Sequence, residues 1–107
     1  ITIEGRDYLR YKPFPVNVAI IRGSFADAHG NVSLDQEAAN VDIYAVALAA
    51  HNCGGKVIVQ VRTAVDVGTL PARSVRIPGA IVDAVVVDPE QRMGYETVYD
   101  PLMSGER

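Results

Sequence analysis

The sequence predicts an α/β domain with an open, mainly parallel sheet. Three apolar runs rich in β-branched residues are typical of strands in such a sheet. They span Val16–Ile21, Lys56–Arg62 and Ala80–Val87. An alanine-rich stretch from about Gln36 to Asn52 has apolar residues at helical spacing and lies between the first two runs. A strand, a helix and a strand in this order predict a right-handed βαβ unit with parallel strands.

Length and composition fit a single domain over residues 1–107. The chain is 49% apolar and 21% charged, with a net charge of −3, and domains usually hold about 100–150 residues. Its ten Lys and Arg residues are not clustered, so we expect no nucleic acid partner. No apolar run approaches the roughly 18–20 residues of a membrane-spanning helix, so we expect no membrane partner.

The elements before the helix are expected in the following order. Alternating residues around Gly5 predict a small hairpin, which Pro13 and Pro15 end. The strand Val16–Ile21 is expected to be covered on both faces and to stop at Arg22-Gly23-Ser24.

A tight turn follows, in which Gly30 supplies a positive φ while Asp27 and Asn31 bond nearby amides. Ser33 or Asp35 is the expected helix cap.

The second half of the chain begins where Gly54-Gly55 ends the helix. After the second strand, Thr63 to Gly79 predicts a long connection with one helical turn around Leu70 to Ser74. Asp88-Pro89 closes the third strand.

From Glu90 the chain turns polar, with Tyr95 and Tyr99 as expected surface anchors. The start without Met and the polar end Ser104–Arg107 predict cut ends of a longer protein.

The residues most often used in metal and nucleophilic sites give weak signals. His29 and His51 do not lie at ligand spacing with a second nitrogen or thiolate, so we expect no metal site. His29 is expected to be solvated, and His51 to interact with carbonyls at the helix end. Cys53 is the one cysteine; it favours a reducing compartment such as the cytoplasm and is expected to be a small buried residue without a nucleophilic role.

Other polar or glycine-containing positions leave two interpretations open. Gly23-Ser24 is either a small-residue break where the backbone approaches a ligand or a tight turn without one. Gln60, the polar residue inside the second strand, either orients a substrate or is a structurally satisfied amide. Gly54-Gly55 does not join a strand to a helix and is no phosphate loop. Asp66, Asp83 and Asp88 form no recognisable acid/base pair.

The order of the motifs resembles the coenzyme A transferases of family I. The matching segments are Gly5-Arg6-Asp7-Tyr8-Leu9, Val18-Ala19-Ile20-Ile21-Arg22-Gly23-Ser24, Ala26-Asp27-Ala28-His29-Gly30-Asn31-Val32-Ser33, Gly54-Gly55-Lys56-Val57-Ile58-Val59-Gln60-Val61, Val67-Gly68-Thr69-Leu70, Val75-Arg76-Ile77-Pro78-Gly79 and Val82-Asp83-Ala84-Val85-Val86-Val87. The chain is most similar to single-chain acetate or propionate transferases, in which an α-type and a β-type half are fused. The succinyl–3-ketoacid type is more distant.

This resemblance implies ping-pong transfer of coenzyme A through a glutamyl-coenzyme A thioester. The family's glutamate belongs to the β-type half, after the linker that Ser104-Gly105-Glu106 begins. The glutamates that do not match its motif are Glu37, Glu90, Glu96 and Glu106. The family's glycine-rich segment would precede Ile1. The chain therefore resembles the C-terminal portion of an α-type domain, with no catalytic residue of its own and no activity by itself.

The resemblance also implies partners and a metabolic setting. Coenzyme A is expected as a substrate, with no permanently bound cofactor and no metal. Partners would be the β-type half, acyl-CoA and carboxylate substrates and, in a homo-oligomer, further copies, within short-chain fatty acid or ketone body metabolism. The expected substrate-adjacent residues are Gly23, Ser24, Asp27, Gly30, Asn31 and Gln60. An acyl-CoA hydrolase on the same scaffold and a non-catalytic interaction module are the alternatives.

Overall fold

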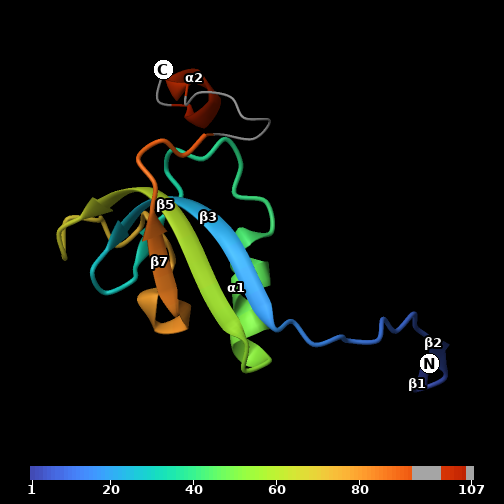
Figure 1. Ribbon diagram of the computed structural model, residues 1–107. Helices are drawn as coiled ribbons and strands as arrows, with labels where there is room; N and C mark the ends of the chain where they lie inside the picture. The colour runs from blue at the N-terminus through green and yellow to red at the C-terminus, as the bar shows by residue number, and fades with distance from the viewer. Residues whose placement is uncertain (93–99, 106–107) are drawn as a thin grey trace.

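The computed structural model describes residues 1–92 and 100–105. Its body is a five-stranded sheet in the order β6-β4-β3-β5-β7 (Figure 1). The strands are β3 (Val18–Asp27), β4 (Val32–Ser33), β5 (Lys56–Val65), β6 (Val75–Ile77) and β7 (Ala84–Val87). β5 runs parallel to both β3 and β7, whereas β4 is antiparallel to β3 and β6. The predicted α/β class with a mainly parallel sheet is confirmed.

The predicted βαβ unit consists of β3, α1 (Ile43–Asn52) and β5. Ala47 and Ala50 are the buried residues of α1, and their small side chains let the helix approach the sheet closely. The core contains Ala19, Ile21, Ala26, Val32, Leu34, Ala47, Ala50, Val57, Val59, Val61, Ile77 and Ile81. Half of these core residues are β-branched residues of the strands, which suit a pleated surface.

One face of the sheet is open in the described part of the chain. Along β5, Val57, Val59 and Val61 are fully buried, whereas Ile20 on β3 is 78% exposed and pairs with the half-buried Ile58. The expectation that the first strand is covered on both faces is therefore wrong for residues 1–92 and 100–105. Alternate residues of a strand point to opposite faces, and α1 covers only one of them.

The helix begins seven residues later than predicted, at Ile43 instead of about Gln36. Neither Ser33 nor Asp35 caps it; the N-cap is Asp42, which makes no side-chain capping bond. Two serine hydroxyls hold the preceding segment in a loop, because Ser33 Oγ accepts from the backbone N–H of Asp35 at 3.1 Å and Ser24 Oγ from that of Gln36 at 2.9 Å. The predicted helix end is confirmed, since Gly54 follows it with a φ of +72°.

Strand bounds also differ from the prediction. β3 continues through Gly23 to Asp27, so this glycine lies within a strand. The run Ala80–Val87 is a strand only from Ala84, because Pro78 precedes the 3-10 helix η1 (Gly79–Ile81).

The connection after β5 contains the unpredicted strand β6. Around Leu70 to Ser74, a turn closed by the bond from Ser74 N to Pro71 O replaces the predicted helical turn.

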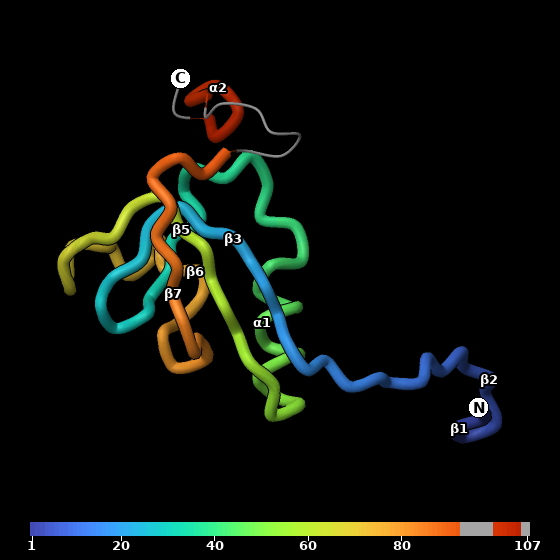
Figure 2. The backbone as a smooth tube through the Cα atoms, in the orientation of Figure 1, coloured from blue at the N-terminus to red at the C-terminus, as the bar shows by residue number. Residues whose placement is uncertain are grey.

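The predicted N-terminal hairpin is confirmed as β1 (Thr2–Ile3) and β2 (Arg6–Asp7), which are antiparallel. An extended segment joins it to the sheet, so that it lies apart from the other elements (Figure 2). The short helix α2 (Pro101–Ser104) is capped by Asp100, whose carboxylate accepts from Leu102 N. In the described residues, no helix has the length and apolar character needed to cross a membrane. Tyr95, Tyr99, Glu96 and Glu106 lie outside the described residues.

Candidate functional site

Three of the six residues expected near a substrate lie together on neighbouring strands. Gly23 and Ser24 belong to β3 and Gln60 to β5, where the register pairs Gly23 with Val61. β7 ends at Val87, which pairs with Val61 from the other side. The chain after β7 therefore turns onto the sheet at this place. We call the polar group formed here the β3–β5 cluster; its members are Arg22, Gly23, Ser24, Glu37, Gln60 and Gln91.

Arg22 ties three segments together within the β3–β5 cluster. Its Nε and Nη2 donate to Glu37 Oε2 at 2.9 and 2.7 Å, and its Nη1 donates to the carbonyl oxygen of Arg92 at 2.7 Å. The Glu37 side chain is 8% exposed and that of Arg22 32%. A carboxylate that is nearly buried needs such a charged partner. The ion pair therefore fixes the loop after β4 against β3.

Two glutamine side chains connect the strands to the segment after β7. Gln91 Nε2 donates to the carbonyl oxygen of Gly23 at 2.8 Å, and Gln60 Nε2 donates to Gln91 Oε1 at 3.1 Å. The backbone supports this placement, because Asp88 N bonds to Val61 O and Gln91 N to Asp88 O. Gln60 is thus a hydrogen-bonded amide with part of its donor and acceptor capacity left over.

Packing explains why position 23 is glycine. A Cβ there would collide with the side chain of Val32 and lie 3.2 Å from the carbonyl oxygen of Ser33. The tight-turn interpretation is wrong, because the residue lies inside β3 and its neighbour β4 comes too close for a side chain. Ser24 is buried, and its hydroxyl is occupied by the backbone N–H of Gln36.

The other three expected residues form a separate unit, which we call the Asp27 turn (residues 27–31). Asp27 Oδ1 accepts from His29 N at 2.9 Å and Asn31 N at 3.0 Å, while its Oδ2 accepts from Asn31 Nδ2 at 3.0 Å. The side-chain amide of Asn31 holds the pKa of Asp27 below its ordinary value; the backbone N–H groups of Asn31 and His29 act in the same direction, against burial. Gly30 has the predicted positive φ, +80°.

The Asp27 turn packs against the start of η1 instead of the β3–β5 cluster. Asn31 Oδ1 accepts from Gly79 N at 3.0 Å, and a Cβ on Gly79 would collide with the backbone of His29. Both carboxylate oxygens of Asp27 are used inside the turn. The hydrogen bonds of the Asp27 turn therefore indicate a structural role.

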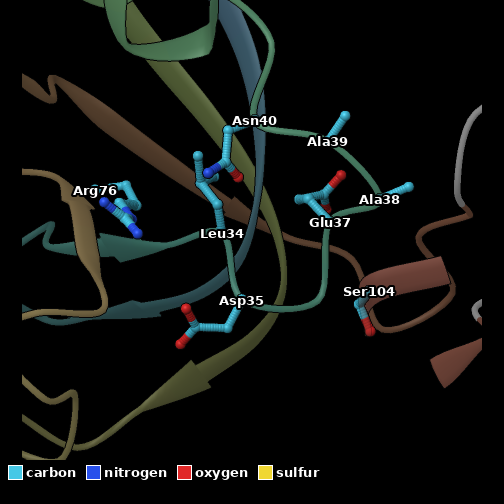
Figure 3. A pocket seen from close by; sticks show the side chains of 8 residues that line it. All are labelled: Leu34, Asp35, Glu37, Ala38, Ala39, Asn40, Arg76 and Ser104. Atoms are coloured by element: carbon cyan, nitrogen blue, oxygen red, sulfur yellow. The ribbon is translucent and has the colours of Figure 1, made fainter. Parts of the chain in front are cut away.

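Cavities lie on both sides of the Asp27 turn and beside the β3–β5 cluster. On one side of the turn, a cavity of about 320 Å³ is also lined by Val82–Val85. On the other side, a cavity of about 440 Å³ is also lined by Val67, Leu70 and Val75. The third cavity, of about 320 Å³, is shown in Figure 3. It is lined by Leu34, Asp35, Glu37, Ala38, Ala39, Asn40, Arg76 and Ser104. Glu37 belongs to both this cavity and the β3–β5 cluster.

The remaining candidate residues are exposed on the surface or have a structural role. His29 and His51 are exposed, and so is Cys53, which was expected to be buried; it is the C-cap of α1, beyond the helix's buried alanines. Within residues 1–92 and 100–105, no three His, Cys, Asp or Glu side chains are grouped so that they could hold a metal ion. Asp83 accepts from Val57 N at 2.8 Å and Lys56 Nζ at 3.0 Å; these two bonds, that from Val57 first, lower the pKa of its carboxyl.

Sequence reasoning missed Arg22, Glu37 and Gln91 as members of the site. The predicted helix contains Glu37, and Arg22 directly follows the predicted strand Val16–Ile21. Gln91 lies in the polar stretch after Asp88-Pro89, and nothing in its local sequence indicates a contact with β3. The one available signal was the position of these residues beside the ends of the predicted strands.

Comparison with known proteins establishes the family to which this chain belongs. The family model for coenzyme A transferase matches residues 1–88. Because the match includes β1 to β7, the chain belongs to the coenzyme A transferase family.

Two curated relatives are CoA-transferases that are much longer than this chain. The chain is 42% identical to caffeate CoA-transferase of Acetobacterium woodii, over 98% of the chain and 21% of the relative. It is 40% identical to acetate CoA-transferase YdiF of Escherichia coli, over 89% of the chain and 18% of the relative. The chain thus spans about a fifth of the length of these proteins.

A solved structure and a separate subunit extend the comparison. The acyl-CoA transferase YdiF of E. coli O157:H7, in a thioester complex with CoA, superposes with a TM-score of 0.92 and 36% identity, over 100% of this chain and 22% of that one. The alpha subunit of the acetoacetyl-CoA:acetate/butyrate CoA transferase of Clostridium acetobutylicum is 32% identical over 83% of the chain and 38% of the subunit. Similarity to an alpha subunit agrees with the predicted α-type half.

Proposed function

We propose that the chain is part of an acyl-CoA:carboxylate CoA-transferase of the acetate, propionate or acetoacetate type. The observation that carries this proposal is the superposition of the whole chain on an acyl-CoA transferase that forms a thioester complex with CoA. The similarity to alpha subunits supports a place in the α-type half, for which we propose the C-terminal portion. Acyl-CoA and a free carboxylate are the proposed substrates.

The proposed reaction runs through a glutamate supplied from outside this chain. Its carboxylate attacks the thioester carbonyl, which forms an acyl–glutamyl anhydride and releases the CoA thiolate. The thiolate then attacks the glutamyl carbonyl, which gives a glutamyl-CoA thioester and the first free carboxylate. An acceptor carboxylate then attacks the glutamyl-CoA thioester. The same two steps in reverse order give a new acyl-CoA and restore the free glutamate. Splitting one difficult exchange into two acyl transfers is the advantage of covalent catalysis.

The contribution proposed for this chain is the β3–β5 cluster. The Gln91 amide connects the Gly23 carbonyl to Gln60 across two parallel strands, and the backbone N–H of Gln36 holds the Ser24 hydroxyl. Polar groups that are already ordered bind a substrate without a further cost of ordering them. We propose a supporting role for Asp27, Gly30 and Asn31, which shape the neighbouring cavities.

The proposed partner is the remainder of the transferase, including the β-type half, and the assembly is proposed to be a homo-oligomer in the cytoplasm. The edge strand β7 supports a covering partner, because no described strand pairs with its outer side.

Incubation with acetyl-CoA and propionate tests the proposed function. We expect the complete gene product that contains this chain to form propionyl-CoA, and residues 1–107 alone to form none. Exchange by residues 1–107 alone would overturn the assignment of the glutamate to another segment. If the complete product releases only free CoA and acetate, it is a hydrolase and the transferase assignment fails. If it neither exchanges nor hydrolyses the thioester, the interaction-module alternative is favoured.

A further inference from the structure

Gln60 and Gln91 form a hydrogen-bond chain with one direction. The carbonyl oxygen of Gly23 can only accept, so the Gln91 atom 2.8 Å away is the donor Nε2. Gln91 therefore offers its Oε1 to Gln60, whose Nε2 donates at 3.1 Å. Turning either amide round would bring two acceptors together. The backbone of β3 thus sets the orientation of the Gln60 side chain through Gln91.

The orientation leaves an acceptor and a donor of Gln60 available. Among residues 1–92 and 100–105, its Oε1 and its second N–H have no partner, and no buried side-chain nitrogen or oxygen lacks one. The Oε1 atom therefore reaches solvent on the open face of the sheet. A carbonyl oxygen and an N–H side by side are complementary to a group that carries both, as an amide does.

The surroundings of Gln60 on this face add an apolar strip. The register pairs Gln60 with Arg22 and Val86, and the row beside it pairs Ile58 with Ile20 and Ala84. Ile20, Val86 and Ala84 are exposed. A ligand that joins amide groups through short alkyl segments matches a donor–acceptor pair next to such a strip.

We propose that Gln60 binds an amide of the pantetheine arm of coenzyme A and that Gln91 is the positioning residue that orients it. The inference rests on the proposed function, because coenzyme A is its proposed substrate. The second substrate, a carboxylate, offers only acceptors and cannot use the Oε1 of Gln60. Gln60 and Gln91 therefore act on the CoA substrate and not on the carboxylate.

Steady-state kinetics of the complete gene product test this inference, because a ping-pong reaction yields a separate KM for each substrate. We expect Gln60→Met to raise the KM for acetyl-CoA by about two- to tenfold, the effect of one neutral hydrogen bond. The KM for propionate and kcat should change less than about twofold, since the amide contact is uniform binding. Gln91→Met should shift the same KM in the same direction without removing Gln60.

The double variant and a matched control separate orientation from general damage. Because Gln91 acts through Gln60, Gln60→Met/Gln91→Met should match Gln60→Met alone. Asn52→Met removes an exposed amide at the end of α1 and should leave both KM values unchanged. An unchanged KM for acetyl-CoA, equal rises in both KM values, or multiplied effects in the double variant would each overturn the inference. If the unsubstituted gene product transfers no CoA from acetyl-CoA to propionate, the proposed function is refuted instead.

Discussion

The Arg22–Glu37 pair gives the sharpest test of how the β3–β5 cluster is held together. Arg22→Met removes three donors and leaves the carboxylate of Glu37, 8% exposed, without its cation. Removing one partner of a fully buried pair costs about 3–5 kcal/mol. Because the Arg22 side chain is 32% exposed, solvent screening lowers the expected cost to about 2–3 kcal/mol.

Amide hydrogen exchange in the complete gene product measures this cost locally. A loss of about 2–3 kcal/mol corresponds to roughly 30- to 150-fold faster exchange in the cooperative unit that opens. We expect this faster amide exchange in the peptides that cover β3 and the loop containing Gln36 and Glu37. Lys56→Met is the matched control, because its 3.0 Å pair with Asp83 joins side chains that are 69% and 33% exposed. Such surface pairs contribute about 0–1 kcal/mol.

Two outcomes would refute this reasoning. If Arg22→Met exchanges no faster than Lys56→Met, the pair does not hold the loop. Glu37→Met/Arg22→Met leaves no unpaired charge and should recover part of the protection. A double variant that exchanges faster than Arg22→Met would show that the buried carboxylate is not the source of the cost.

Three further predictions concern the Asp27 turn and the helix end. Gly79→Ala should destabilise the protein by about 2 kcal/mol or more in urea unfolding, because its Cβ collides with His29; unchanged stability would contradict the close approach. Asp27 has a folded-state pKa below its ordinary 3.8, so its stabilisation is complete above that value and is lost as pH falls through the folded pKa. The stability gap between the parent and Asp27→Asn should therefore narrow below about pH 4, and a constant gap would refute the linkage. Cys53 is exposed and should react with iodoacetamide without denaturant, as mass spectrometry would show; protection would place another segment over it.

Much of the fold could be predicted from local patterns. The βαβ unit, the hairpin around Gly5 and the Asp27 turn follow from strand and helix periodicity and from turn residues whose partners lie within a few positions. The end of α1 at Gly54 follows from a local signal as well. These features need no knowledge of distant contacts.

The missed features depend on contacts between distant residues. The segment before α1 has helical composition, but Ser24 Oγ, twelve residues away in sequence, bonds to Gln36 N and holds a loop. Gln91 contacts Gly23, which lies 68 positions earlier in the sequence. The local sequence around either residue does not indicate this contact. β6 has only three residues, too few for a periodic signal.

The central claim is that this chain works with a glutamate from another segment to carry coenzyme A. Intact-mass analysis of the complete gene product after incubation with acetyl-CoA, without an acceptor, tests it most directly. We predict a covalent CoA adduct that peptide mapping places outside residues 1–107 and that propionate removes as propionyl-CoA. The absence of an adduct while exchange proceeds, or an adduct on a residue of this chain, would contradict the account.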